Sequence, residues 1–279
     1  MTSLLFGFLT AVGFGAGDFF GGLASRRLPA LTVALYSQLL AAVFLVLAAL
    51  IWAGPVGSAD VFWAGAAGLM AGVAIVRYYR GLACGVMGWV AALVGMLSAL
   101  VPFVVGVALG ERPTLLAAFG IFTIISSLIF VTRKRGRKLR SVPIAGLADG
   151  LFAGVCFGFS FVFLGQSEAE NPLGPVAVLL AASVVPIGLI QLRTYQCWGT
   201  NLASVAPLVA AGLCQGFAML AFGLAVREGL VSVVSVAGAL SPVLTALLAR
   251  CFLEEALSRR QAIGLMVAMA GIVLLVVGS

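Results

Sequence analysis

The segment GLMAG at residues 68–72 recurs as GLCQG at residues 212–216, and this repetition decides how the chain is organised. A shift of 144 residues brings the two segments into register. The same shift pairs further glycines and also pairs Glu111 with Glu255. Several matches in one register, with a glutamate among the glycines, indicate that the sequence contains two copies of one unit.

The composition around these repeats is typical of a membrane protein. Of the 279 residues, 63% are hydrophobic and 9% are charged, and the mean hydropathy is +1.21. A membrane-spanning helix needs about 20 apolar residues, whereas the strands of a membrane barrel alternate apolar and polar residues. The apolar runs here are continuous, so the sequence predicts an all-α integral membrane protein. We expect ten transmembrane helices, at residues 4–24, 30–52, 61–80, 86–109, 114–132, 143–165, 174–192, 204–226, 230–253 and 259–278.

Five of these helices fall into each copy of the repeat. A unit that crosses the membrane five times ends on the side opposite to its start, so its copy must enter from the other side. We therefore expect two inverted five-helix repeats, residues 1–132 and 143–279, joined by a basic cytoplasmic linker at 133–142. Inverted repeats are typical of secondary transporters, because two such halves can open a shared site to either side of the membrane.

The distribution of positive charge predicts the orientation. The net charge is +7, and the linker contains the run RKRGRKLR at 133–140. All basic residues except Arg112 and Arg227 flank the connections that follow odd-numbered helices. Basic residues beside helix ends are retained in the cytoplasm, so we expect both termini outside the cytoplasm and the protein in the inner (plasma) membrane. The basic run then contacts acidic membrane lipids rather than nucleic acid.

The residue inventory argues against an enzyme. The chain has no histidine, nine acidic residues, and five cysteines without CxxC spacing. Histidine is the commonest metal ligand and general base, and a GxxxxGK[ST] phosphate loop is also missing from the sequence. We therefore expect no catalytic residues, no metal site and no cofactor, and transport driven by a solute or proton gradient.

One carboxylate lies inside the first predicted helix, in the glycine-spaced segment AVGFGAGDFFGG at residues 11–22. An unpaired carboxylate at the centre of a membrane helix costs about 2.5–3.5 kcal/mol on insertion scales, so Asp18 needs a partner or water. Asp18 either lines a cavity, where it binds an ammonium group or carries a proton, or it forms a structural pair with Arg77 or Arg80.

The segment RYYRG at 77–81 supplies further candidates. Tyr78 and Tyr79 point to different sides of the helix, so at most one should face a cavity squarely; interfacial aromatic belts are the alternative explanation for both. Gln215 should face the bundle interior, because its amide has several hydrogen-bonding groups to satisfy in an apolar surrounding. The full set of expected substrate-binding residues is Asp18, Arg77, Tyr78, Tyr79, Trp89, Ser160, Gln215 and Ser235.

Four stretches carry a resemblance to a known family: GAGDFFGGLASRRLPALTVALYSQ (15–38), RYYRGLACGVMGWVAAL (77–93), VPFVVGVALGERPT (101–114) and GALSPVLTALLARCFLEEALSRRQAIG (238–264). The chain resembles the drug/metabolite transporter superfamily, in its EamA-type ten-helix branch. The resemblance implies a central cavity between helices 1, 3 and 4 of one half and 6, 8 and 9 of the other, with helices 5 and 10 outside. The second copy reads LEEALS where the first reads GERPT, which leaves the substrate class open.

Together these features predict a monomeric secondary transporter that works by alternating access. Its substrate would be a small polar or zwitterionic metabolite such as an amino acid, moved outward. The alternative is a flippase for a lipid-linked sugar or a related amphipathic phosphate, in which Arg77 and Arg80 would be the binding groups. Uptake into vesicles with an imposed proton gradient would separate proton coupling from facilitation or exchange.

Overall fold

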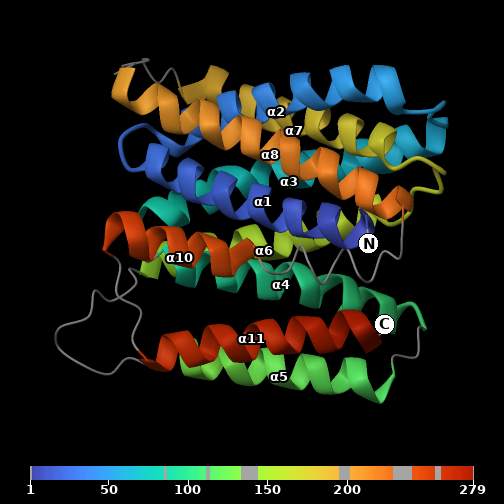
Figure 1. Ribbon diagram of the computed structural model, residues 1–279. Helices are drawn as coiled ribbons and strands as arrows, with labels where there is room; N and C mark the ends of the chain where they lie inside the picture. Colours follow the sequence, from blue (N-terminus) through green and yellow to red (C-terminus); the bar gives the residue numbers. More distant parts are fainter. Residues whose placement is uncertain are drawn as a thin grey trace.

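The computed structural model describes residues 2–84, 87–110, 114–132, 144–194, 202–228, 241–254 and 259–278. Over these residues every regular element is an α-helix, and the helices lie side by side along one direction (Figure 1). They are α1 (Thr2–Ser25), α2 (Ala30–Trp52), α3 (Ser58–Cys84), α4 (Met87–Ala108), α5 (Leu115–Thr132), α6 (Ile144–Leu164), α7 (Leu173–Thr194), α8 (Leu202–Glu228), α10 (Ser241–Leu253) and α11 (Arg259–Gly278).

The predicted spans agree with these helices to within four residues at each end, except for the ninth. Of the span predicted at 230–253, the structure describes only α10, and residues 229–240 lie outside the described residues. The linker at 133–142 also lies outside them. The helix ends could be predicted because charged residues, glycine and proline interrupt otherwise continuous apolar runs.

Seven of the described helices are long and apolar enough to cross a membrane, namely α1 to α4 and α6 to α8. α10 is a shorter apolar helix, as is the Ala262–Gly271 stretch of α11. Large apolar side chains are also exposed on the outside of the bundle, among them Leu47, Leu50, Phe62, Leu189 and Leu192. An exposed apolar surface of this extent fits a lipid surrounding, and the protein is a multi-pass membrane protein.

The helices of the two halves pack against each other more than within each half. α1 packs mainly on α8 and α3 mainly on α6, while α7 also contacts α3 and α8 also contacts α2. α5 and α11 form a separate pair beside the other helices (Figure 1). α5 and α11 correspond to the predicted spans 114–132 and 259–278, the two that the resemblance implied would lie outside the other helices.

Glycines permit the closest of these contacts. A Cβ atom at Gly72 of α3 would overlap the carbonyl oxygen of Ser183 in α7, and one at Gly68 would overlap that of Leu179. Small residues let backbones approach in membrane interiors, where packing rather than hydrophobicity drives helix association. The GLMAG segment therefore fixes α3 against α7.

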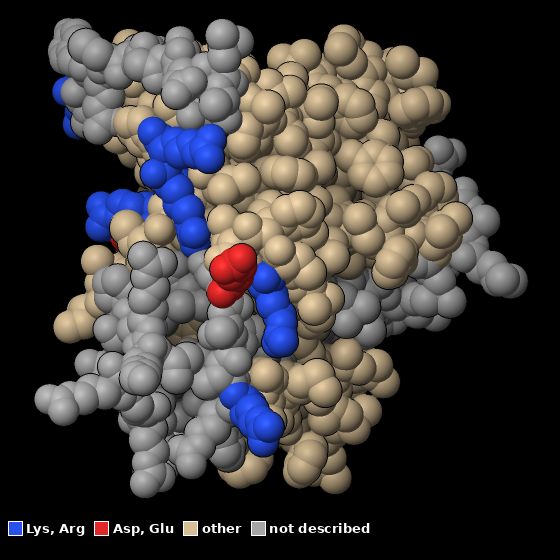
Figure 2. Space-filling model, turned by 60° about the vertical axis from the view of Figure 1, so that its left-hand side comes forward, with Lys and Arg blue, Asp and Glu red and all other residues tan. Residues whose placement is uncertain are grey.

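The bundle has one basic end. Both chain termini lie at the opposite end of the bundle (Figure 1). Figure 2 shows blue side chains running across the basic end. Among the described side chains, seven arginines lie in or beside the helix ends that meet here: Arg26, Arg27, Arg77, Arg80, Arg193, Arg250 and Arg259.

Candidate functional site

A buried carboxylate lies between α1 and α3. The hydroxyl of Tyr78 donates a hydrogen bond of 2.9 Å to Oδ2 of Asp18, and the two residues are 4% and 8% exposed. Asp18 is seven residues before the end of α1, which places it roughly 10 Å from the basic end of that helix. Asp18 forms no ion pair with any residue that the structure describes. Its charge therefore lacks a protein counter-ion within the described part of the chain.

Two glycines of α1 make room for polar side chains next to Asp18. A Cβ atom at Gly17 would lie 3.2 Å from Oε1 of Gln215 in α8, and one at Gly21 would lie 2.7 Å from the hydroxyl oxygen of Tyr79 in α3. Residues four apart share one face of a helix. The Gln215 and Tyr79 side chains therefore contact the same stripe of α1, about one turn apart.

Both of these side chains hold an oxygen that is buried without a hydrogen bond among the described residues, Oε1 of Gln215 and the hydroxyl of Tyr79. The Tyr79 hydroxyl lies beside Ser37 of α2 but forms no hydrogen bond of acceptable geometry with it. Gln38, the next residue in α2, buries a third oxygen of this kind. Unsatisfied buried oxygens are unusual and point to a strained or functional site.

Tyr78 and Tyr79 are both buried, and their rings stack with centroids 6.2 Å apart. The alternative that they belong to an interfacial aromatic belt is wrong, because belt residues sit at the membrane surface with an exposed polar end. The edge of Phe157 of α6 also packs on Tyr78, at 6.0 Å between ring centroids. The two tyrosines thus connect α3 with helices of both halves.

Arg77 and Arg80 do not pair with Asp18, so that alternative is also wrong. Nη1 of Arg77 lies 3.0 Å from Oδ1 of Asp149 in α6, and Nε of Arg80 lies 2.6 Å from Oδ2. Asp149 is 1% exposed, whereas the two arginine side chains are about half exposed. Three residues apart on α3, the two arginines share the face toward α6, while Tyr78 between them faces α1.

Asp149 is a functional candidate that the sequence reasoning missed. It lies five residues after the start of α6, in a segment that otherwise reads as an ordinary apolar helix. The signal that could have identified it is the pair Arg77 and Arg80, three residues apart inside a predicted membrane helix, because two such cations require a counter-charge.

The other predicted site residues are less closely connected to Asp18. Trp89 is 4% exposed and belongs to the apolar core around α1, α3 and α4, and Ser160 is 3% exposed in α6. Ser235 lies outside the described residues. The structure thus brings Asp18, Tyr78, Tyr79 and Gln215 together, and it places Arg77 in a different cluster.

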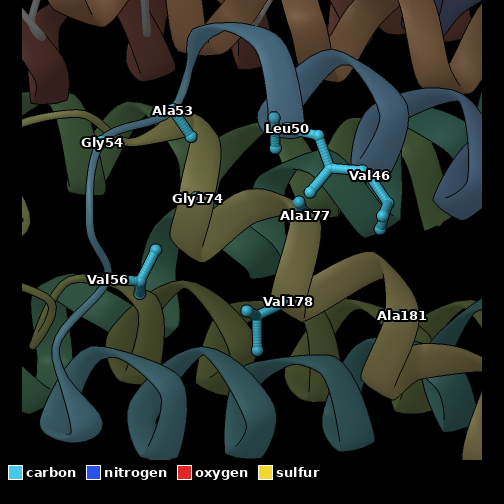
Figure 3. A pocket seen from close by; sticks show the side chains of 10 residues that line it. Val46, Leu50, Ala53, Gly54, Val56, Gly174, Ala177, Val178 and Ala181 are labelled. Atoms are coloured by element: carbon cyan, nitrogen blue, oxygen red, sulfur yellow. The ribbon is translucent and has the colours of Figure 1, made fainter.

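A surface hollow of about 380 Å³ lies elsewhere, between the end of α2 and the start of α7 (Figure 3). Every residue that lines it is apolar or glycine: Val46, Ala49, Leu50, Ala53, Gly54, Val56, Gly174, Ala177, Val178 and Ala181. With no polar side chain to orient a solute, this hollow differs from the polar cluster at Asp18.

Comparison with known families finds a match in the second half of the chain. Residues 144–277, which run from α6 to α11, match the EamA-like transporter family. The match covers a little under half of the chain. This match is consistent with the predicted resemblance to membrane transporters of the drug/metabolite superfamily, and it includes residues 238–264 of that resemblance.

Similar solved structures agree with this fold. One crystal structure of a protein is similar to this chain over 95% of the length of each, with 16% sequence identity and a TM-score of 0.60. At this identity the likeness shows the fold alone. No curated protein matches the chain.

Proposed function

We propose that the protein is an EamA-like secondary transporter that exports a small polar or zwitterionic solute with an ammonium group. The observation that carries the proposal is the buried Asp18 carboxylate, held by Tyr78 and paired with no described cation. A carboxylate inside a membrane bundle needs compensation for its charge. The ammonium group of a transported solute would supply it.

The polar groups around Asp18 suit such a ligand. A primary ammonium has three donors and no acceptor, so it binds best where several oxygens converge. Asp18 supplies a carboxylate oxygen, and Gln215 and Tyr79 supply two buried oxygens without partners on the adjacent stripe of α1. The stacked tyrosine rings add an aromatic surface against which a cation is stabilised.

Alternating access would follow from two inverted halves, residues 1–132 and 143–279, with 133–142 as the cytoplasmic linker. The helix contacts support this reading when α1 to α5 are matched with α6, α7, α8, α10 and α11. Under that exchange the contact of α1 with α8 becomes that of α6 with α3, and α2 with α8 becomes α7 with α3. The contacts of α2 with α7 and of α5 with α11 map onto themselves.

The repeated glycine segments support the same equivalence. Gly68 and Gly72 of α3 pack against the backbone of α7, and Gly212 and Gly216 of α8 pack against α2, where an added Cβ at Gly212 would lie 2.8 Å from the Ser37 carbonyl oxygen. α2 and α7 are the second helices of the two halves. The family match also begins at the first helix of the second half.

The orientation remains as the charges predict. The basic end would face the cytoplasm and its acidic lipids, and the termini would lie outside it, with the protein a monomer in the inner membrane. Arg77 and Arg80 already bind Asp149, so they offer less support for the capture of a lipid phosphate than Asp18 does for an ammonium group.

The proposal is tested with pairs of amino acids and their N-acetyl derivatives, compared by thermal shift of the purified protein. A ligand that binds only the folded state raises the melting temperature. We expect stabilisation by at least one free amine, none by its N-acetyl form, and loss of the effect in Asp18→Asn but not in Glu170→Gln, which removes an exposed carboxylate instead. Equal stabilisation of Asp18→Asn would contradict the role of Asp18.

A further inference from the structure

We infer that α3 and α6 carry two latches, one at each end of the bundle, and that each latch opens in one of the two states of the transport cycle. The basic-end latch joins Asp149 to Arg77 and Arg80. The opposite latch joins Asp60 to Ser167 and Glu168. The inference rests on the proposed function, because it assigns these contacts to the alternating opening of the same site.

The basic-end latch joins the two halves through charge. Both oxygens of the Asp149 carboxylate are occupied, at 3.0 Å by Arg77 and at 2.6 Å by Arg80. The Arg77 guanidinium also lies over the ring of Phe152, one turn further along α6, at 5.2 Å from the ring centre. Three interactions thus hold this end of α3 to α6.

The charges of this latch can be rehydrated when it opens. The arginine side chains are 45% and 53% exposed, so water already reaches them, and only Asp149 is fully buried. Opening the basic end would bring water to Asp149 as it leaves the arginines. A buried ion pair that loses one partner without gaining water is strongly destabilised, and this geometry avoids that outcome.

The opposite latch joins the same two helices by hydrogen bonds. Asp60 lies in the first turn of α3, and its Oδ1 accepts two hydrogen bonds from residues just after α6. One comes from the Ser167 hydroxyl at 2.7 Å and the other from the Glu168 backbone N–H at 2.9 Å. Oδ2 accepts a hydrogen bond of 3.2 Å from the backbone N–H of Gly57, just before the start of α3. Asp60 is only half-buried, so water can reach these bonds and replace them when they open.

The two latches are separated by most of the length of α3. Asp60 and Arg77 are 17 residues apart, or roughly 26 Å along a regular helix. With both latches closed, α3 and α6 are held together at both ends. The halves can tilt apart at one end only if that latch opens, and the latch at the other end can then serve as the hinge. Weakening either latch should therefore open the site toward its own side.

Cys214 provides a native reporter for this effect. It is near the middle of α8, is partly buried, and its thiol lies near Tyr79. The test uses a variant in which the other four cysteines, Cys84, Cys156, Cys197 and Cys251, are replaced by alanine. A membrane-impermeant maleimide is added to right-side-out and to inverted vesicles, and the labelling rate of Cys214 is measured from each side.

We expect Asp149→Asn to raise labelling at least about threefold from the basic-end side only, and Asp60→Asn to raise it similarly from the opposite side only, since a threefold population shift needs about 0.65 kcal/mol. Asp149→Glu, which keeps the charge, and Glu170→Gln, which removes an exposed acid after α6, should label like the parent. If Asp149→Asn does not fold, Arg80→Gln removes one pair and leaves the Arg77 pair in place.

Equal increases from both sides, or no change in either variant, would overturn the two latches, because loosening without direction indicates purely structural contacts. This outcome is distinct from failure of the proposed function. A protein that shows side-specific labelling but neither binds nor transports amines would retain the latches and lose the proposed substrate. A protein that transports amines but shows unaltered labelling in both variants would retain the proposed substrate and lose the latches.

Discussion

The hydroxyl of Tyr78 donates a 2.9 Å hydrogen bond to the carboxylate of Asp18, and so links the third helix of the chain to the first. A neutral donor of this kind orients the carboxylate without cancelling its charge. Arg77 and Arg80, the neighbours of this tyrosine pair, are bound to Asp149 instead. The tyrosines of the RYYR segment therefore belong to the candidate site, whereas its arginines belong to the contact between α3 and α6.

Tyr78→Phe should weaken solute binding while Tyr79→Phe weakens it less. A hydrogen bond to a charged group contributes about 1.5–3 kcal/mol, so the apparent affinity for an ammonium solute should fall about 10- to 100-fold without the Tyr78 hydroxyl. Tyr79→Phe removes one neutral oxygen that would contact the ammonium group, but it leaves the Asp18 carboxylate held by Tyr78, so its effect should be smaller. Equilibrium binding to both purified variants is the measurement; a larger loss in Tyr79→Phe would refute this division of roles.

Gln215→Met should separate stability from activity. The Oε1 atom of Gln215 is buried without a partner among the described residues, and such an atom costs about 1–3 kcal/mol. Methionine keeps a similar shape without this oxygen, so we expect an unchanged or higher melting temperature together with slower transport. If the variant instead melts earlier and transports normally, Gln215 supports the fold rather than the solute.

Gly72→Ala should destabilise the bundle, whereas Gly65→Ala on the same helix should not. A Cβ atom at Gly72 would overlap the backbone of Ser183, whereas nothing lies within 4 Å of one at Gly65. Overpacking of this kind costs about 1–3 kcal/mol. Thermal unfolding of the two variants in detergent compares them directly, and equal melting temperatures would show that α3 and α7 do not pack this closely.

Reporter fusions at the two termini should be active only outside the cytoplasm. Both termini lie at the end opposite to Arg26, Arg27, Arg77 and Arg80, and cytoplasmic retention of basic residues fixes that arrangement in the membrane. A phosphatase that needs export and a fluorescent protein that folds only inside the cell give complementary signals. Cytoplasmic activity at both ends would reverse the orientation.

Much of the fold could be predicted from the sequence, because apolar runs of membrane length are interrupted by charge, glycine or proline. The inward face of Asp18 could also be predicted, since a carboxylate cannot face lipid without a large cost. Which helices pack against each other was harder to predict from the sequence. Asp149 and Arg77 are 72 residues apart, and their contact depends on which helices are neighbours.

The tyrosine pair illustrates the same limit. Helical spacing placed Tyr78 and Tyr79 on different sides of α3, and the structure buries both because α1 and α2 lie on those sides. Gly21 is what admits the Tyr79 ring against α1, and sequence alone gives no reason to match that glycine with that tyrosine. Tertiary packing, rather than local preference, decides such contacts.

Counterflow in proteoliposomes tests the central claim most directly, because it distinguishes a carrier that alternates between two sides from a pore. Vesicles that contain the protein are loaded with an unlabelled amine solute identified by thermal shift and are diluted into a trace of the labelled solute. We predict a transient accumulation of label above its equilibrium level with the unaltered protein, and none with Asp18→Asn. Uptake without this overshoot, or an equal overshoot in Asp18→Asn, would contradict alternating access through a site at Asp18.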